Sequence, residues 1–158
     1  MKTDRLLKVT ENMHKMGLKQ LLISAPNSIF YLTGKFIHPG ERMVVLSVLE
    51  NGDVTLFANR LFAVGGIEGA KLIEYDDTDD CIGVLSEGVV SGNVGFDKEW
   101  AVRFALPLME RRTDIKASAA RAQTFGLVHI NVCNLRFLHA VRKRRNRFVN
   151  RLVVQAGA

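Results

Sequence analysis

The order of apolar and polar positions predicts helices that alternate with strands along most of the chain. An apolar series at near-helical spacing runs from Leu6 to Met16, and Gly17 after it favours a helix stop. Further helices are predicted at residues 61–64, at 78–87 with Thr78 as a cap, and at 99–111. Strands are predicted at residues 19–24, 42–49, 54–57, 71–75, 93–96 and 115–117, the last at an edge.

One turn decides how the predicted sheet is built. Asn51-Gly52 lies between two strand-like runs, and an Asn-Gly step in that position is typical of an antiparallel hairpin. The other strands alternate with helices, which favours parallel neighbours. We therefore expect an α/β domain with a mixed central β-sheet flanked by helices.

The segment Ser24–Arg42 combines a strand exit, a short helix and a polar loop. Pro26 offers a helix start, Asn27 or Ser28 can cap it, and Gly34 can end it. Phe30 and Tyr31 are expected in the core, because they lie in an apolar helix.

The loop that follows holds His38, Glu41 and Arg42 within five residues. Titratable side chains on a loop are common at functional sites, although a polar loop is first of all a solvated one.

Length and charge narrow the class of protein. With 158 residues, of which 47% are hydrophobic, one globular domain is expected. No apolar run approaches the ~20 residues that span a bilayer, and the charged N-terminus is unlike a signal peptide, so we expect a cytoplasmic protein without membrane contact. The net charge of +6 divides into −2 over residues 1–120 and +8 over residues 121–158.

The chain offers little catalytic chemistry. No glycine-rich phosphate loop or nucleophile elbow occurs, and Cys81 and Cys133 have no metal or redox spacing. The acidic run Asp76–Asp80 is better explained as the start of a helix than as a cation site. Asp97–Glu99 follow a strand and precede a helix, so we interpret them as helix-capping residues and not as acid–base catalysts. We therefore predict no catalytic residue, no metal ligand and no cofactor in this chain.

Several ordered motifs together resemble a known family over about residues 5–118. They are Ser24–Gly34, His38-Pro39-Gly40-Glu41-Arg42, Leu56-Phe57 with Arg60-Leu61-Phe62, Gly95–Trp100 and Leu106–Glu110. In this order they are similar to the N-terminal domain of the creatinase/prolidase metallopeptidases, and most of all to bacterial Xaa-Pro dipeptidases.

The resemblance implies a three-layer, ribonuclease-H-like N-terminal domain at residues 1–120. Relatives hydrolyse Xaa-Pro peptide bonds in a separate C-terminal "pita-bread" domain that holds two divalent metal ions (Mn, Co or Zn). Residues 121–158 are too few for that domain, so we expect it to be absent and the chain alone to be inactive.

The resemblance also suggests what such a domain does for its parent hydrolase, namely subunit contact and active-site capping. It implies a homo-oligomer that meets peptide substrate only with a catalytic domain. The substrate-proximal candidates are then His38, Glu41 and Arg42. Arg42 could bind the carboxylate of a peptide, Glu41 could bind its amino terminus, and His38 could act as a titrating group. A solvated or internally paired loop is the alternative.

The basic tail, residues 121–158, departs from the family, whose members continue into a linker helix. A one-base shift in codons that can encode His139–Leu152 reads Met-Arg-Ser-Val-Lys-Asp-Glu-Ile-Asp-Leu-Leu-Thr-Ala, which is like that linker, so a frameshift is one explanation. A nucleic-acid-binding arm, which we consider less plausible, and an end without function are the others. A freestanding peptide-binding or dimerisation module is the alternative function for the whole chain.

Overall fold

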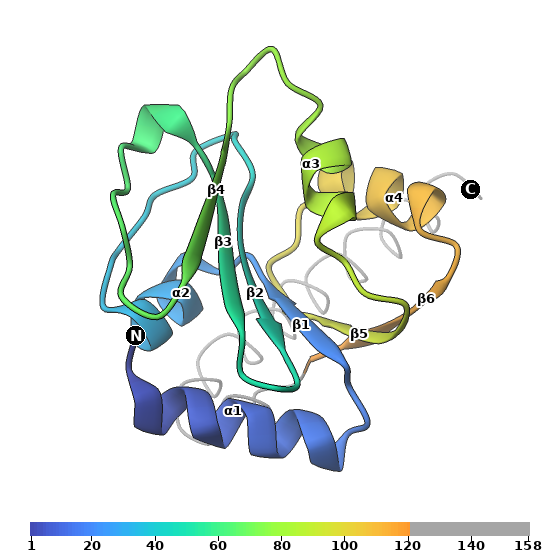
Figure 1. The fold of residues 1–158 in the computed structure, drawn as a ribbon. Helices are drawn as coiled ribbons and strands as arrows, with labels where there is room; N and C mark the ends of the chain where they lie inside the picture. The colour runs from blue at the N-terminus through green and yellow to red at the C-terminus, as the bar shows by residue number, and fades with distance from the viewer. Residues whose placement is uncertain (121–158) are drawn as a thin grey trace, which may run out of the picture. The chain divides into compact units, whose positions relative to one another are not determined.

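The computed structural model describes residues 1–120, which form one mixed sheet with helices on both faces (Figure 1). The helices are α1 (Thr3–Lys15), α2 (Pro26–Thr33), the 3-10 helix η1 (Arg60–Phe62), α3 (Cys81–Glu87) and α4 (Val102–Arg111). The strands are β1 (Gln20–Ile23), β2 (Val44–Leu49), β3 (Val54–Asn59), β4 (Lys71–Tyr75), β5 (Gly92–Phe96) and β6 (Ile115–Ala119).

The strand order is β4-β3-β2-β1-β5-β6. β2 is antiparallel to both β1 and β3, whereas the β1–β5, β3–β4 and β5–β6 pairs are parallel. The predicted hairpin joins β2 to β3, and Gly52 in its turn has φ 90°, a conformation that favours glycine. The α/β class and the mixed sheet are thus confirmed.

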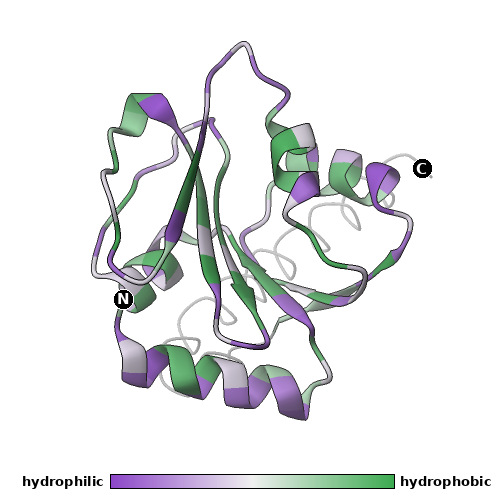
Figure 2. Cartoon of the chain, viewed as in Figure 1, coloured by the Kyte–Doolittle hydropathy of each residue, from purple (hydrophilic) through white to green (hydrophobic). Residues whose placement is uncertain are grey.

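Strand alternation divides the core into two apolar layers. Leu22 of β1 packs with Phe57 of β3 and Leu85 of α3 in the layer under α3 and α4. Leu21 and Ile23 point to the opposite face, and both are fully buried. Figure 2 shows the central strands as the most continuously hydrophobic part of the described chain. The sheet therefore separates two helical layers in a three-layer domain.

One buried polar side chain joins the sheet to the turn after α3. The Gln20 amide nitrogen donates to Ser47 Oγ at 2.7 Å and to the Gly88 carbonyl at 2.8 Å, while its oxygen accepts from Val90 N at 2.8 Å. Gln20 is fully buried, so these bonds replace the water that its amide loses on folding.

The structure corrects the placement of Phe30 and shows that the apolar series of the first helix is only partly buried. Leu7 and Met16 belong to the apolar series of the first helix, yet they are 57% and 40% exposed, and the series is buried only at Val9 and Met13. Phe30 was expected in the core, but it is 49% exposed on the outer side of α2. Helical spacing alone does not say how wide the buried stripe is.

Two predicted helix caps are also wrong. Ala25 is the N-cap of α2 and Pro26 occupies its first turn, so neither Asn27 nor Ser28 caps this helix. At α3 the cap is Asp80, whose Oδ1 accepts from Gly83 N at 3.0 Å, in place of Thr78. The predicted stop of α2 is confirmed, because Gly34 adopts φ 77° there.

The predictions for Cys133 and for the basic tail concern residues outside the described range. Within residues 1–120, no helix is both long and apolar enough to cross a membrane.

Candidate functional site

The carboxyl ends of β1 and β5 lie side by side at the centre of the sheet, and Asp97 joins them. Asp97 follows β5 directly, and its Oδ2 accepts from Ala25 N at 2.7 Å and from Ser24 N at 3.0 Å. Its Oδ1 accepts from Ser24 Oγ at 3.0 Å and from Glu99 N at 3.3 Å. One carboxylate thus fixes the start of α2 against the segment that leads to α4.

The role predicted for Asp97 was wrong. It does not cap α4, whose N-cap is Ala101. Asp97 is only 6% exposed, and burial raises the pKa of its carboxyl, opposed by the hydrogen bonds from Ala25 and Ser24. Ser24 and Ala25 lie more than 70 residues away from Asp97 along the chain, so local spacing could not indicate these two partners.

Trp100 closes the same junction from the other side. Its Nε1 donates to the Leu22 carbonyl at 3.1 Å, and its ring meets Phe96 edge-on with the centroids 5.0 Å apart. The indole hydrogen bond therefore links the segment before α4 to β1.

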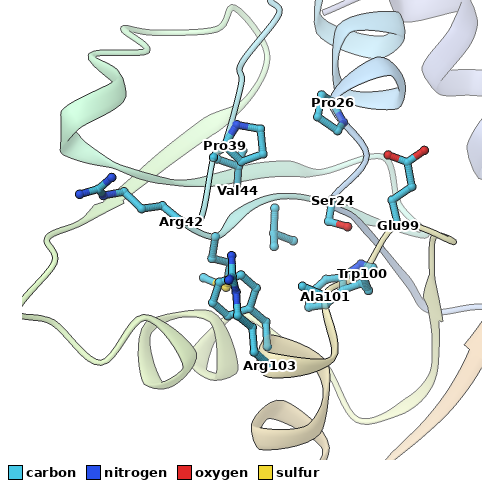
Figure 3. A pocket seen from close by; sticks show the side chains of 13 residues that line it. Ser24, Pro26, Pro39, Arg42, Val44, Glu99, Trp100, Ala101 and Arg103 are labelled. Atoms are coloured by element: carbon cyan, nitrogen blue, oxygen red, sulfur yellow. The ribbon is translucent and has the colours of Figure 1, made fainter.

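A pocket of about 220 Å³ opens beside this junction (Figure 3). Its lining combines apolar side chains with polar groups of both charges. The lining residues that matter for the argument are Ser24, Pro39, Arg42, Glu99, Trp100 and Arg103. The carboxyl ends of parallel strands whose connections leave in opposite directions are a common place for ligands in α/β sheets.

The Lys35–Arg42 loop borders this pocket and is tied down at both ends. Lys35 Nζ donates to the carbonyls of Val64 at 2.6 Å and Gly66 at 3.0 Å. Near the other end, Arg103 Nη2 of α4 donates to the Glu41 carbonyl at 2.6 Å. The loop is therefore held in one arrangement before anything binds to it.

Arg42 has a partner within the domain. Its Nε and Nη2 donate to the two carboxylate oxygens of Asp77 at 2.7 and 2.6 Å, and Asn59 Nδ2 donates to Asp77 Oδ1 at 2.7 Å. The hydrogen bond from Arg42 lowers the pKa of the Asp77 carboxyl, and the same bond raises the pKa of Arg42. A substrate carboxylate would have to compete with Asp77 for this guanidinium.

The three candidate side chains do not converge on one point. Arg42 lines the pocket beside β1 and β5, whereas His38 lines a second pocket of about 310 Å³ with Phe36 and Phe62. His38 and Glu41 are exposed, and His38 Nδ1 accepts from Gly40 N at 3.3 Å. Their substrate-proximal role stays a prediction.

An exposed aromatic pair lies at the beginning of the loop. Phe36 is 60% exposed, and its ring meets that of Phe30 edge-on at a centroid distance of 6.3 Å. Sequence analysis placed Phe30 in the core and gave Phe36 no firm position, so it missed this pair. Apolar surface of this kind, rimmed by polar groups, is typical of a contact site.

The described residues do not fit the two metal ions that the family resemblance implies. Nowhere in residues 1–120 do three His, Cys, Asp or Glu side chains come together as a metal site. In the acidic run, Asp77 binds Arg42 and Asp80 both caps α3 and meets Arg111 at 2.6 Å. These carboxylates therefore form ion pairs and a helix cap within the fold.

Comparison with known families and structures gives a consistent result. The profile of the Creatinase/Prolidase N-terminal domain matches residues 5–122. The N-terminal domain of an X-Pro dipeptidase from Streptococcus pyogenes is similar at 18% identity and TM-score 0.64, over 74% of this chain and 99% of that one. A proline dipeptidase structure from Streptococcus pneumoniae is similar at 20% identity and TM-score 0.68, over 78% and 98%.

A dipeptidase from Pyrococcus horikoshii shows how the domain relates to a longer chain. It is similar at 22% identity and TM-score 0.65, over 77% of this chain but only 35% of its own length. At these sequence identities, the structural similarity establishes a shared fold and nothing further. No curated protein matches the sequence.

Proposed function

Because the chain belongs to the creatinase/prolidase N-terminal domain family, we propose that residues 1–120 form the noncatalytic domain of an Xaa-Pro dipeptidase-like metallopeptidase. Its tasks are subunit contact and capping of an active site. Two divalent metal ions, held by a catalytic domain, would supply the hydrolytic chemistry.

The observation that carries the capping role is the fixed yet exposed Lys35–Arg42 loop. Lys35 and Arg103 hold its two ends, while Phe36 is 60% exposed between them. A contact surface that is already ordered loses little conformational entropy on binding. The exposed side chains of His38 and Glu41 can then contact a peptide at the rim of a site that a catalytic domain completes.

A chimera tests this function directly. Residues 1–120 would replace the matching part of the Pyrococcus horikoshii dipeptidase, which is 35% of that chain, and Xaa-Pro hydrolysis would be measured with Mn²⁺ or Co²⁺. We expect activity above that of the isolated catalytic part, and a lower kcat/KM after Phe36→Ser. Leu61→Ser, another exposed apolar position at 65%, is the matched control and should leave kcat/KM unchanged. A folded, metal-loaded chimera no better than the isolated part would contradict the proposal.

A peptide-binding module is the second candidate, and the pocket in Figure 3 favours it. Glu99 and Arg103 place opposite charges on a rim around an apolar floor, which suits the two ends of a short peptide. Trp100 is the only tryptophan in the chain and lines the pocket, so its fluorescence reports binding. An Xaa-Pro dipeptide titration should shift the emission, and a flat titration would exclude this candidate.

A further inference from the structure

The turn between β2 and β3 carries an asparagine followed by a glycine, and this pair lies at the surface. Asn51 is exposed, and the space around Gly52 is open, since a Cβ placed there would meet nothing within 4 Å. An Asn-Gly step is reactive as well as turn-forming, because glycine has no side chain to shield its main-chain nitrogen from the preceding side chain. Asparagine is also among the thermolabile residues of proteins. The turn therefore has to be considered as a place of covalent change.

The reaction that an Asn-Gly step permits is deamidation through a cyclic imide. The main-chain nitrogen of Gly52 bonds to Cγ of Asn51 and gives up its hydrogen, while the bond from Cγ to Nδ2 breaks and that nitrogen leaves as ammonia. Water then opens the ring. Breaking the new bond at Cγ gives aspartate, whereas breaking the original main-chain bond gives isoaspartate, whose main chain runs through Cβ and Cγ. Water is consumed and ammonia is released, so the change needs no enzyme.

The folded turn engages the groups that this reaction uses. Gly52 N donates to the Leu49 carbonyl at 3.0 Å, so the attacking nitrogen is held within the turn. Asn51 Nδ2 donates to Asp53 Oδ2 at 2.8 Å, and Asn51 Oδ1 accepts from Asp53 N at 3.0 Å. Ring closure requires the Gly52 amide to leave the Leu49 carbonyl, and it breaks the bond from Nδ2 to Asp53. The closed turn therefore protects Asn51.

We propose that Asn51 is a site of spontaneous deamidation whose rate is set by opening of the β2–β3 turn. Exposed turns open locally at a lower free energy than the whole domain unfolds, so the reaction proceeds in a chain that is otherwise folded. The fraction of chains changed at Asn51 then records how long and how often the turn has been open.

Both products weaken the turn that protected Asn51. Each replaces the Nδ2 donor by a carboxylate oxygen, which opposes Asp53 Oδ2 across the present 2.8 Å contact. The new carboxylate is also the third acid among residues 50–53. Isoaspartate adds an atom to the main chain between Leu49 and Asp53, where the bond from Leu49 N to the Asp53 carbonyl closes the hairpin at 2.9 Å. A changed chain should therefore open more readily and unfold at a lower denaturant concentration.

This turn lies at the end of the sheet opposite to the pocket. Leu49 pairs with Gln20 at the start of β1, whereas the pocket is built at Ser24, after the end of β1. Figure 1 shows the β2–β3 turn at the lower end of these strands. Deamidation thus acts on the stability and lifetime of the domain, and its test is independent of the proposed function.

Mass spectrometry of the tryptic peptide 43–60 tests the site, because cleavage after Arg42 and Arg60 puts Asn51 and Asn59 in one fragment. The full chain is incubated at mildly alkaline pH, folded or in guanidinium chloride, and digested under mildly acidic conditions. Fragmentation assigns the gain in mass to one asparagine. We expect the gain at Asn51 and not at Asn59, which precedes an arginine, and a rate at least about tenfold lower in the folded chain.

Hydrogen exchange of the Gly52 amide measures the opening independently. Its protection factor should equal the ratio of the two deamidation rates, because the same opening frees this amide for both reactions. Asp53→Ala should lower the protection of Gly52 and raise the deamidation rate of the folded chain by the same factor. Glu50→Ala changes another exposed acid of the turn and is the matched control, which should alter neither quantity.

Three results would overturn the proposal. A gain in mass that is absent from Asn51 in guanidinium chloride, or equal at Asn59, would remove the site. Equal rates in the folded and unfolded chain would remove the control by the turn. A folded-state rate that does not follow the protection of Gly52 would do the same. Circular dichroism checks the folding of Asp53→Ala, and the wild-type comparison alone decides if that variant does not fold.

Discussion

The Asp97 carboxylate accepts a 2.7 Å hydrogen bond from the main-chain amide of Ala25, and so ties the end of β5 to the N-cap of α2. The two residues are 72 positions apart in the chain. The Asp97 carboxylate accepts hydrogen bonds from four donors in all. The geometry of the pocket and of the nearby loop therefore depends on this one side chain.

Asp97→Asn should destabilise the domain by about 1–3 kcal/mol, because an amide group turned toward main-chain N–H groups leaves buried donors unsatisfied. Urea denaturation followed by circular dichroism measures the loss. Asp4→Asn on the exposed first turn of α1 is the control, with an expected change within ~0.5 kcal/mol. Equal small effects at both positions would contradict the role given to Asp97.

Gly88→Ala should lower the free energy of unfolding by about 1–3 kcal/mol, because the added methyl group overpacks the core. A Cβ at Gly88 would lie 2.6 Å from Phe57 Cζ, and Phe57 is only 1% exposed, so its ring has no room to move. Gly66→Ala is a matched control, since a Cβ there meets nothing within 4 Å and the backbone is not left-handed. Thermal unfolding that is unchanged by Gly88→Ala would show that the turn after α3 packs differently.

The Arg42–Asp77 pair should show measurable coupling in a double-mutant cycle of Arg42→Ala and Asp77→Ala. The bidentate geometry predicts that the second substitution costs less than it does alone. The pair is exposed, so the effect is expected to be small and to fall with added salt. Strict additivity of the unfolding free energies would mean that Arg42 is available to other carboxylates.

Low pH should reduce the stability of the domain, partly because the Asp114 carboxyl becomes protonated. Arg112 donates to both carboxylate oxygens of Asp114 at 2.8 and 2.7 Å, and Ser91 Oγ donates to Oδ2. These bonds hold the pKa of the Asp114 carboxyl far below its usual range. A carboxyl whose pKa falls on folding stabilises the fold above its unfolded pKa of about 3.9, and this contribution is lost as pH falls through the folded value.

The corresponding measurement is urea denaturation of the wild-type chain and of Asp114→Asn at several pH values between about 5 and 2. We expect the wild-type chain to lose more of its stability over this interval than the variant does. Parallel curves for the two proteins would show that Asp114 contributes nothing to the acid response.

Much of the fold could be predicted because its signals are local. The Lys71–Tyr75 strand coincides with β4, and Asn51-Gly52 marked the β2–β3 hairpin. The loop with His38, Glu41 and Arg42 was also found, since its residues are adjacent in sequence. Local pattern could not find Asp77 as the partner of Arg42, 35 residues away, or Ser24 and Ala25 as partners of Asp97, more than 70 residues away. These contacts depend on which strand ends meet in the sheet.

Asp97 shows why such misses occur. An acid between a strand and a helix is usually favoured by the helix dipole, and that reasoning assigned Asp97 to the helix that follows it. The parallel pairing of β1 with β5 instead brings the amides of Ser24 and Ala25 within reach. A tertiary contact therefore overrode a local preference.

The most direct measurement of the central claim is proline release from an Xaa-Pro dipeptide by the purified 158-residue chain, with Mn²⁺ or Co²⁺ and with a chelator as control. A noncatalytic domain predicts a rate equal to that of buffer with metal alone. Metal-dependent turnover that copurifies with the chain and disappears with the chelator would contradict the claim.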